Sequence, residues 1–289
     1  MCRCLAFVPG RKALLDKALR VTPSVFVADL EDSIAPANKQ AARHDVAEYV
    51  HALPPRAPGA APWLVRVNSL QSGLFEADLD AVLCDRVVGV SVGKVGSAAE
   101  LRAIEEAVAL RERRLGLSVK LCVLPWLETA RGVADAAAIC HGATRVAGVA
   151  FGLDDFLADV GLSLDDADDR DFATLHARRC VTLAAAAAGL PAFESPFVNF
   201  KDSDGCARYA RRAKLLGFSG QFSIHPSQVA TIEAAFGASP DELAKAQAIV
   251  DQYEAAEKQQ LGSTSLGAMM IDRPVYIRAK RLVDTHRRA

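Results

Sequence analysis

The sequence has almost no excess of charge of either sign. Its 34 Lys and Arg residues stand against 35 Asp and Glu residues, which leaves a formal net charge of −1 at pH 7. A chain without a basic excess lacks the electrostatic field that draws polyanions to a protein surface. We therefore expect no nucleic acid partner and no attraction to an anionic membrane.

Long apolar runs and paired cysteines are also missing. No stretch approaches the ~20 apolar residues of a membrane span, and the apolar run at the N-terminus is too short for a secretory signal. The seven cysteines form an odd, scattered set without a CxxC pair, which indicates reduced thiols and argues against disulfides or a structural zinc site. These absences predict a soluble, cytoplasmic protein.

What the sequence does contain is a regular alternation of short apolar runs and longer helical patterns, which is typical of repeated βα units around a parallel sheet. The candidate strands are Leu5–Val8, Val25–Asp29, Leu64–Val67, Val87–Val92, Lys120–Leu124, Val146–Ala150, Ala192–Glu194 and Gln221–Ile224. Helical patterns such as Ala98–Arg113 and Thr174–Ala188 lie between them. Eight strands close a barrel, and a (β/α)₈ TIM barrel typically needs ~250 residues. An open doubly wound sheet competes, but no GxGxxG motif follows the first strand.

The end of the chain has a different pattern. Asp241–Gln260 reads as an amphipathic helix, Gly262–Gly267 as a linker of small residues, and Asp272–Arg287 as a second helix. We therefore predict a TIM barrel catalytic domain over residues 1–236 and a C-terminal helical extension over residues 237–289. The extension would pack locally or on a neighbouring subunit.

Polar residues follow many of the predicted strands, at the positions where TIM barrels carry their chemistry. They are Asp29, Glu31, Asp32, Arg66, Asn68, Lys94, Glu128, Asp154, Asp155 and His225. Crowded carboxylates repel one another unless a cation bridges them, and hard oxygen ligands favour Mg²⁺. Glu128 and Asp155 follow adjacent strands, so we predict that they bind the metal ion. Arg66 would then pair with a substrate carboxylate or a developing enolate oxygen.

Plainer interpretations exist for the same residues. Arg66 could form a structural salt bridge with Asp29 or Glu31, and on periodicity alone this is as good an interpretation as substrate binding. A single acidic residue at a helix start, such as Asp154, is more often a cap or a dipole partner than a ligand. For His225, which precedes a proline, a capping role is the better interpretation.

Six segments, taken in order, resemble the motifs of the citrate lyase β-subunit-like (HpcH/HpaI aldolase) family. They are Phe7–Gly10, Ala28–Ser33, Val65–Asn68, Glu128–Gly132, Phe151–Asp155 and Ile224–Gln228. The resemblance covers essentially the whole chain. It implies a Mg²⁺-dependent TIM barrel that cleaves or forms a carbon–carbon bond beside a thioester, in substrates such as citryl-, malyl-, citramalyl- or β-methylmalyl-CoA.

The resemblance also implies roles for individual residues. Glu128 and Asp155 match the metal ligands, and Arg66 matches the substrate-binding arginine. Glu31 and Asp32 match an acidic pair that holds metal-bound waters. Lys17 matches a helix lysine near the CoA phosphates, and Phe7 and Arg11 are expected to contact the substrate or CoA beside it. Asp272, within Met270–Pro274, matches an aspartate that acts in a neighbour's active site. Members are commonly trimers, so a homotrimer is expected. Asp272 is then the first candidate for the catalytic base, and Glu31 or a metal-bound water is the alternative.

Three places depart from the family pattern. Arg11-Lys12 stands where an Asp-Arg-Pro type sequence is expected, so the residues that grip the CoA phosphates stay open. Ser91–Lys94 replaces the expected Leu-Pro-Lys, and Trp126 replaces a smaller apolar residue. The last two changes border the pocket and could narrow it. They leave open an atypical substrate, including one that is not a CoA ester.

Our leading interpretation is a lyase that cleaves or condenses a short 3-hydroxyacyl-CoA, with an acyl-CoA and a keto acid as its small-molecule partners. Retro-aldol cleavage needs a base for the hydroxyl proton and stabilisation of the enolate, which Mg²⁺ with Arg66 would supply. The alternatives are a class II pyruvate aldolase on a free hydroxy-keto acid, or a catalytically weak subunit that binds metal and CoA within a larger complex. The sequence does not name the acyl group, the keto acid or the direction of the reaction.

Overall fold

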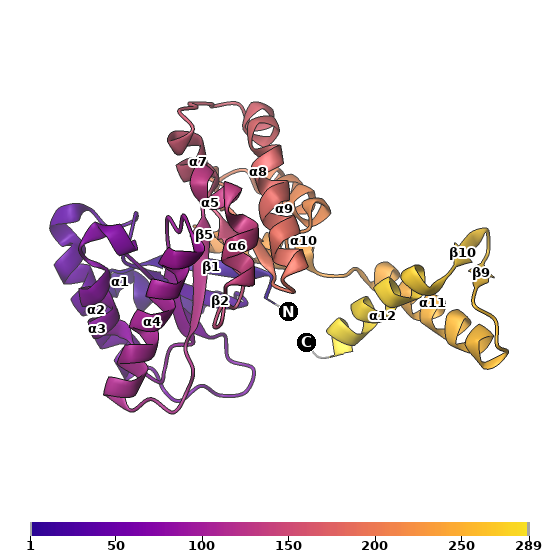
Figure 1. Cartoon of the computed structure of the whole chain (residues 1–289), viewed down its shortest axis with the longest axis horizontal. Coiled ribbons are helices and arrows are strands. Elements are labelled where there is room, and N and C mark those ends of the chain that lie inside the picture. The colour runs from indigo at the N-terminus through magenta and orange to yellow at the C-terminus, as the bar shows by residue number, and fades with distance from the viewer. Residues whose placement is uncertain (1, 288–289) are drawn as a thin grey trace. The chain divides into compact units, whose positions relative to one another are not determined.

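The computed structural model describes residues 2–287 and divides the chain into two compact units (Figure 1). The larger unit runs from Cys2 to Phe236, and the smaller unit begins at Gly237. Met1 and the last two residues, 288–289, lie outside the described part of the chain. No helix within residues 2–287 is both long and apolar enough to cross a bilayer.

The larger unit is built on eight parallel strands that close into a barrel in chain order, with β1 paired to both β2 and β8. The strands are β1 (Cys4–Pro9), β2 (Val25–Asp29), β3 (Trp63–Val67), β4 (Gly89–Val92), β5 (Cys122–Leu127), β6 (Val149–Phe151), β7 (Ala192–Glu194) and β8 (Gly220–Ser223). This topology confirms the predicted (β/α)₈ barrel.

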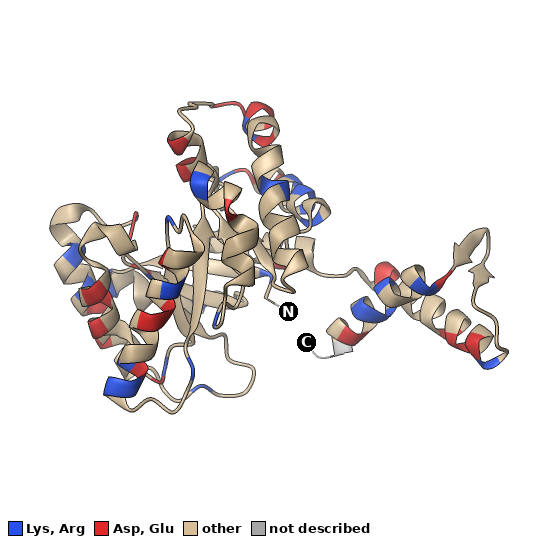
Figure 2. Cartoon of the chain, in the orientation of Figure 1, with Lys and Arg blue, Asp and Glu red and all other residues tan. Residues whose placement is uncertain are grey.

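Helices connect successive strands and surround the barrel (Figure 1). They are α1 (Lys12–Leu15), α2 (Lys39–Ala52), α3 (Phe75–Val82), α4 (Ala98–Leu115), α5 (Ala130–Ala134), α6 (Ala136–His141), α7 (Leu153–Asp159), α8 (Ala167–Ala187), α9 (Ser203–Leu216) and α10 (Pro226–Phe236). Three short 3₁₀ turns lie at η1 (Ala18–Arg20), η2 (Pro36–Asn38) and η3 (Leu70–Ser72). Both signs of charge occur along neighbouring helices (Figure 2), and Arg111 on α4 joins Glu76 and Asp80 at 2.5 and 2.9 Å.

Side chains along each strand alternate between two apolar cores, as the pleat of a β-strand requires. Val27, Leu64 and Trp126 belong to a core inside the barrel, whereas neighbours such as Phe26 and Val65 belong to the larger core that includes the surrounding helices. Asp29, Arg66 and Glu128 lie two residues beyond Val27, Leu64 and Trp126 and continue the inward series. The same alternation that fills the barrel therefore aims these polar side chains at its mouth.

The strand bounds differ most from the predicted ones at β5 and β6. We predicted a strand over Lys120–Leu124, but β5 continues through Pro125 to Leu127. Proline normally argues against a central strand because it has no N–H to donate, yet the register continues past it, with Trp126 opposite Ala150. The strand predicted over Val146–Ala150 also begins later, and Val146 forms only an isolated bridge with Val123.

The smaller unit is a pair of helices joined by a hairpin. It contains α11 (Pro240–Lys258), β9 (Thr264–Leu266), β10 (Met269–Ile271) and α12 (Arg273–Arg287). Its core includes Ile249, Tyr253 and Ile271, and Tyr253 stacks on Tyr276 with ring centroids 4.5 Å apart. The predicted linker over Gly262–Gly267 was therefore wrong in part, because it contains β9 and the start of a tight turn at Gly267, whose φ is 60°.

A buried ion pair ties the outside of the barrel to its helices. Arg178 on α8 contacts both Glu194 at the end of β7, with its Nη2 2.6 Å from Oε2, and Asp171, with its Nη1 2.6 Å from Oδ1. The other carboxylate oxygen of Glu194 accepts the Ser195 N–H at 2.9 Å. Arg178 thereby holds the segment that leaves β7 toward the mouth of the barrel.

Replacing Arg178 by Met should lower the free energy of unfolding by about 3–5 kcal/mol, because it leaves Glu194 buried without its partner. The matched control is Arg212→Met, which removes an arginine that also contacts Asp171 but is exposed, and should cost less than about 1 kcal/mol. Urea unfolding of both variants would measure the difference. Equal losses would show that the buried pair does not stabilise the barrel.

Candidate active site

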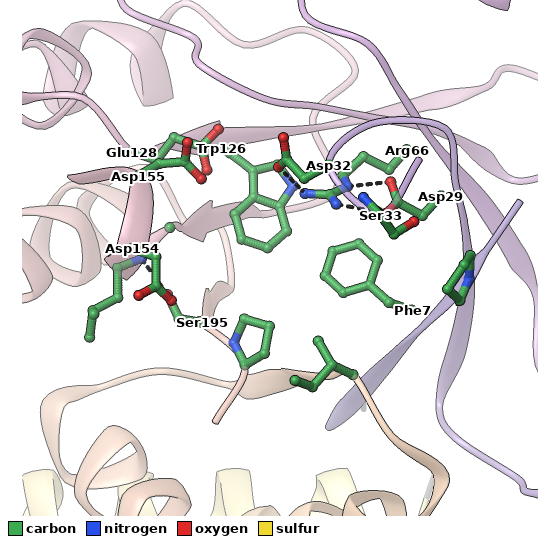
Figure 3. Close-up of a pocket in the computed structure, with 15 residues that line it drawn as sticks. Phe7, Asp29, Asp32, Ser33, Arg66, Trp126, Glu128, Asp154, Asp155 and Ser195 are labelled. Carbon is green, nitrogen blue, oxygen red and sulfur yellow. Dashed lines mark hydrogen bonds and ion pairs between the residues drawn. The ribbon is translucent and has the colours of Figure 1, made fainter. Parts of the chain in front are cut away.

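A cavity of about 480 Å³ opens at the carboxyl ends of the strands (Figure 3). Its wall includes Phe7 from β1, Arg66 from β3, and Trp126 and Glu128 from β5 or just beyond it. Figure 3 shows Glu128 and Asp155 on one side of the indole of Trp126, and Arg66 with Asp29 on the other. The ion pair of Arg66 with Asp29 and the acidic group that includes Glu128 and Asp155 therefore face the same cavity.

The pair consists of Arg66 and Asp29, both buried. Arg66 Nε and Nη2 donate to the two oxygens of Asp29 at 2.6 and 2.7 Å, and Nη1 lies 3.2 Å from Asp32 and 3.3 Å from Glu31. Burial acts to raise the pKa of Asp29, but the charge and hydrogen bonds of Arg66 outweigh it and hold that pKa below its ordinary value. The salt bridge to Asp29 that the sequence left open is thus present.

Asp29 also shapes the acidic loop that follows β2. Its Oδ1 accepts the Glu31 N–H at 2.9 Å, and its Oδ2 accepts the Ser33 N–H at 3.3 Å. Lys39 completes the loop from outside, since its Nζ donates to the Glu31 carbonyl at 2.6 Å and to Asn68 Oδ1 at 2.7 Å. The positions of Glu31 and its neighbour in the loop therefore depend on two buried or half-buried cations.

The acidic group gathers around Lys94. The ammonium of Lys94 lies 3.5 Å from Asp155, 3.8 Å from Glu31 and 4.0 Å from Asp32. Its backbone N–H donates to Glu128 Oε1 at 2.8 Å, from a left-handed conformation with φ of 59° that L-residues seldom adopt. Three carboxylates thus lie around the ammonium of Lys94, and a fourth, that of Glu128, accepts the backbone N–H of the same residue.

Burial and mutual repulsion raise the proton affinity of two of these carboxylates. Burial, followed by the charges of Asp155 and Glu31, raises the pKa of Glu128 to about 8. Burial raises the pKa of Glu31 to about 7, although Arg66 acts in the opposite direction. Both carboxylates are therefore unfavourable as isolated anions, and a bound cation would relieve that cost.

Two glycines allow the carboxylates to approach the backbone. A Cβ atom at Gly93 would lie 2.7 Å from a Glu31 oxygen and 2.8 Å from a Glu128 oxygen, and a Cβ at Gly152 would overlap the Glu128 carboxylate. The space that a side chain would take is thus left to the acidic groups.

This donor set fits a hard divalent cation such as Mg²⁺. All the donors are carboxylate oxygens, and Glu31 Oε2, which lies 3.3 Å from Arg66 Nη1, makes no hydrogen bond to any described group. No three His, Cys, Asp or Glu side chains within residues 2–287 stand ready at ligand spacing. A cation here would therefore take one or two protein carboxylates and complete its coordination with water or substrate oxygens, as Mg²⁺ usually does.

The structure brings together most of the residues predicted for the site. Phe7, Asp32, Arg66, Glu128 and Asp155 line the cavity, and Glu31 adjoins it. Three predicted residues lie elsewhere. Arg11 lines a separate cavity of about 260 Å³, Lys17 is exposed after α1, and Asp272 belongs to the smaller unit, where its Oδ1 accepts the Val275 N–H at 3.2 Å.

The roles of some residues of the site could not be predicted from the sequence. Ser195 Oγ donates to the Phe151 carbonyl at 2.7 Å and accepts the Leu153 N–H at 2.6 Å, which fixes the connection that carries Asp155. Its one signal was its place directly after the seventh strand. Asp154, by contrast, forms an ion pair with Arg170 at the start of α7, which agrees with the plainer interpretation of that residue.

Replacing Asp29 by Asn should lower the free energy of unfolding by about 2–4 kcal/mol, because Arg66 keeps its charge in a buried site without its bidentate partner. The control is Asp32→Asn, since Asp32 contacts the same guanidinium but is 53% exposed and should cost less than about 1 kcal/mol. Chemical denaturation of both variants without added metal would test this. Similar losses would mean that Asp29 does not anchor Arg66.

Comparison with known proteins gives a consistent family. A sequence model of the HpcH/HpaI aldolase/citrate lyase family matches residues 3–226. A citrate lyase subunit beta-like protein of Deinococcus radiodurans is 35% identical over 291 residues, which covers 98% of this chain and 96% of that protein. The mitochondrial citramalyl-CoA lyase of Rattus norvegicus is 30% identical, over 97% of this chain and 85% of that enzyme.

A solved structure agrees with these sequence matches. The crystal structure of CitE from Mycobacterium tuberculosis in complex with magnesium, acetoacetate and coenzyme A is 29% identical in sequence, with a TM-score of 0.78. The match covers 98% of this chain and 97% of that one. With a family match over most of its length and a relative at 35% identity, the chain belongs to the HpcH/HpaI aldolase/citrate lyase family of enzymes.

Proposed function

We propose that the protein is a Mg²⁺-dependent carbon–carbon lyase that cleaves, or forms by condensation, a short 3-hydroxyacyl-CoA such as malyl-, citramalyl- or citryl-CoA. The products of cleavage would be an acyl-CoA and a keto acid. The observation that carries this proposal is the acidic group of Glu128, Asp155 and Glu31 facing Arg66 across one cavity. The names of the rat lyase and of the mycobacterial complex support it.

Glu128 and Asp155 would hold the metal ion, and Glu31 with Asp32 would hold its waters. When bound, Mg²⁺ would polarise the oxygens of the keto acid half and offset the charge of the enolate. The raised pKa of Glu128 and the absence of a hydrogen bond at Glu31 Oε2 support this assignment. So does the glycine at position 93, which leaves room for both carboxylates.

Arg66 would bind and orient the substrate. Its bidentate contact with Asp29 fixes the plane of the guanidinium, and the ring of Phe7 lies against it, 4.4 Å from its central carbon. A guanidinium held in this way presents its donors in a set direction and needs little reorganisation during the reaction. Arg66 would thereby align the carbonyl that forms as the carbon–carbon bond breaks.

Cleavage also needs a base that takes the proton of the 3-hydroxyl group. As this proton leaves, the oxygen forms the keto group, the adjacent carbon–carbon bond breaks, and its electron pair passes to the carbon beside the thioester. We assign the base to Asp272 of a neighbouring subunit in a homotrimer, with Glu31 as the reserve candidate. Asp272 is half-buried at the junction of β10 and α12, and its side chain caps the first turn of that helix.

We assign the CoA moiety to Phe7, Arg11 and Lys17. Arg11 and Lys17 are exposed at either end of α1, as cations that bind phosphates in solvent must be, and Arg11 borders a second cavity close to the acidic loop. Phe7 lines the main cavity, and Ser33 lines both cavities. With its seven cysteines unbridged, the protein suits the reducing cytoplasm in which we place it.

Glu128→Gln should weaken Mg²⁺ binding at least 100-fold and lower kcat for cleavage by a similar or larger factor, because an amide cannot replace the buried anion. Isothermal titration with Mg²⁺ and release of keto acid from citramalyl-CoA and malyl-CoA would measure both effects. Asp154→Asn is the control for metal binding, since that neighbouring carboxylate pairs with Arg170. Unchanged Mg²⁺ affinity in Glu128→Gln would remove Glu128 from the metal site.

Two inactive variants should restore activity to each other if Asp272 acts in a neighbour's site. Asp272→Asn and Glu128→Gln each inactivate every site of a homotrimer. In a 1:1 mixture that assembles at random, about a quarter of all sites in the mixture would be intact, and all of these would lie in mixed trimers. Recovery to that level would support trans action. If native mass spectrometry shows mixed trimers and no activity returns, Asp272 is not the trans-acting base.

A further inference from the structure

An aromatic layer closes the barrel directly beneath the acidic group. The rings of Phe7, Trp126 and Phe222 pack against one another, with centroids 4.4–5.8 Å apart. Trp126 is 3% exposed and Phe222 is fully buried, and Phe193 packs below Phe222 at 6.4 Å. The cavity therefore ends at Phe7 and Trp126, which line it, and does not continue into the barrel.

The indole of Trp126 is held in one orientation by the neighbouring strand. Its Nε1 donates to Ser91 Oγ at 2.7 Å, and Ser91 Oγ donates to the Leu124 carbonyl at 3.2 Å. Ser91 lies on β4 two residues after Gly89 and two residues before Gly93, which follows the end of the strand, so this side of the interior carries small residues. The bulk of the indole occupies the space that these residues leave.

Trp126 also lies where the reacting end of the substrate would lie. It precedes Glu128 by two residues on the inner face of β5, and its ring centroid is 5.9 Å from the guanidinium carbon of Arg66. A keto acid bound between Glu128 and Arg66 would therefore rest on this ring. Figure 3 shows the indole in this place between the two groups.

The charges around the cavity limit which keto acid fits. Among the described residues that line the cavity, Arg66 is the only Lys, Arg or His, whereas five residues are Asp or Glu. A second carboxylate on the keto acid would face these anions or the apolar side chains of Leu153, Pro196 and Ile224. The ammonium of Lys94 lies near this wall, but three carboxylates, those of Asp155, Glu31 and Asp32, already lie 3.5–4.0 Å from it. A second carboxylate would therefore lose its hydration without gaining a cation of its own.

We infer that Trp126, fixed by Ser91, is the specificity-determining floor of the keto acid subsite. It restricts that subsite to a 2-oxo acid with a single carboxylate and no more than a methyl group beyond the keto carbon. This inference rests on the proposed function, because it takes Glu128 and Arg66 as the groups that hold the keto acid. It selects glyoxylate or pyruvate as the keto acid and excludes oxaloacetate, so among the substrates proposed above it keeps malyl- and citramalyl-CoA and removes citryl-CoA.

The first test measures binding and needs no turnover. The chain has two tryptophans, and Trp63 packs against Phe26 and Tyr49 in the outer core, so Trp63→Phe leaves Trp126 as the reporter. With Mg²⁺ present, glyoxylate and pyruvate should change its emission saturably. Oxaloacetate and 2-oxobutyrate should bind at least tenfold more weakly. Equal affinity for pyruvate and oxaloacetate would overturn the inference.

The second test enlarges the floor. Trp126→Leu should raise the ratio of kcat/KM for 2-oxobutyrate over pyruvate, in condensation with acetyl-CoA or propionyl-CoA, by about 10–100-fold, as expected when a pocket gains room for one methylene. Ser91→Ala should raise it by less, and Phe193→Leu, which alters the layer below, should leave it unchanged. Trp126→Phe serves as a smaller change that keeps an aromatic ring. An unchanged ratio in folded Trp126 variants would overturn the inference.

The two tests separate this inference from the proposed function. If pyruvate selectively changes the Trp126 emission but the protein neither condenses nor cleaves any CoA ester, the role of Trp126 is supported and the proposed lyase activity is refuted. If oxaloacetate is condensed with an acyl-CoA at the same rate as pyruvate, the proposed lyase activity is supported and the role of Trp126 is refuted.

Discussion

The buried guanidinium of Arg66 holds together a group of carboxylates that would otherwise repel one another. It meets both oxygens of Asp29 and lies within 3.3 Å of Glu31 and Asp32. Asp29 in turn accepts backbone N–H groups from the loop that carries these acids. The pair therefore sets the loop geometry as well as its charge, and the cavity keeps its shape because the pair is buried.

The opposite side of the mouth is organised by close packing and by repulsion. Glu128 lies against the backbone at Gly152, beside Glu31 at Gly93, and its raised pKa reflects burial together with neighbouring carboxylates. The ammonium of Lys94 relieves part of that repulsion without a close contact, at 3.5 Å or more from each carboxylate that it faces. Under the proposed function, a site that is incompletely neutralised in this way would accept one more cation, and the rest of the fold offsets the free energy that such a site costs.

The sequence predicted the barrel and much of its mouth because both follow from one rule. Short Val- and Leu-rich runs place strands, and polar residues such as Arg66 and Glu128 stand two positions beyond an inward apolar residue. Residues that act across the fold gave no such signal. Ser195 bonds to the end of another strand, and Lys39 reaches back from α2 to the acidic loop.

Local signals also misled where tertiary structure overrode them. Pro125 marked the end of a strand in the sequence, but the barrel carries β5 two residues further, and this extension gives Trp126 its inward direction. The small-residue segment before Met269 looked like a linker because β9 and β10 are too short and too exposed to leave an alternating pattern. The distinction matters, since that hairpin leads directly into Asp272.

Under the proposed function, the residue that sets specificity and a residue that binds the metal ion would face the barrel interior from the same strand, β5. Trp126 on β5 and Glu128 just beyond its end face inward, and Ser91 on β4 and Gly93 just beyond its end lie beside them. Ser91 orients the indole, whereas Gly93 leaves room for the carboxylates of Glu31 and Glu128. The aromatic layer and the acidic layer above it therefore depend on different residues. A change of volume at the lower layer consequently leaves the charges above it in place, because Glu128 is fixed by Lys94 N–H and by the backbone at Gly152 rather than by the indole.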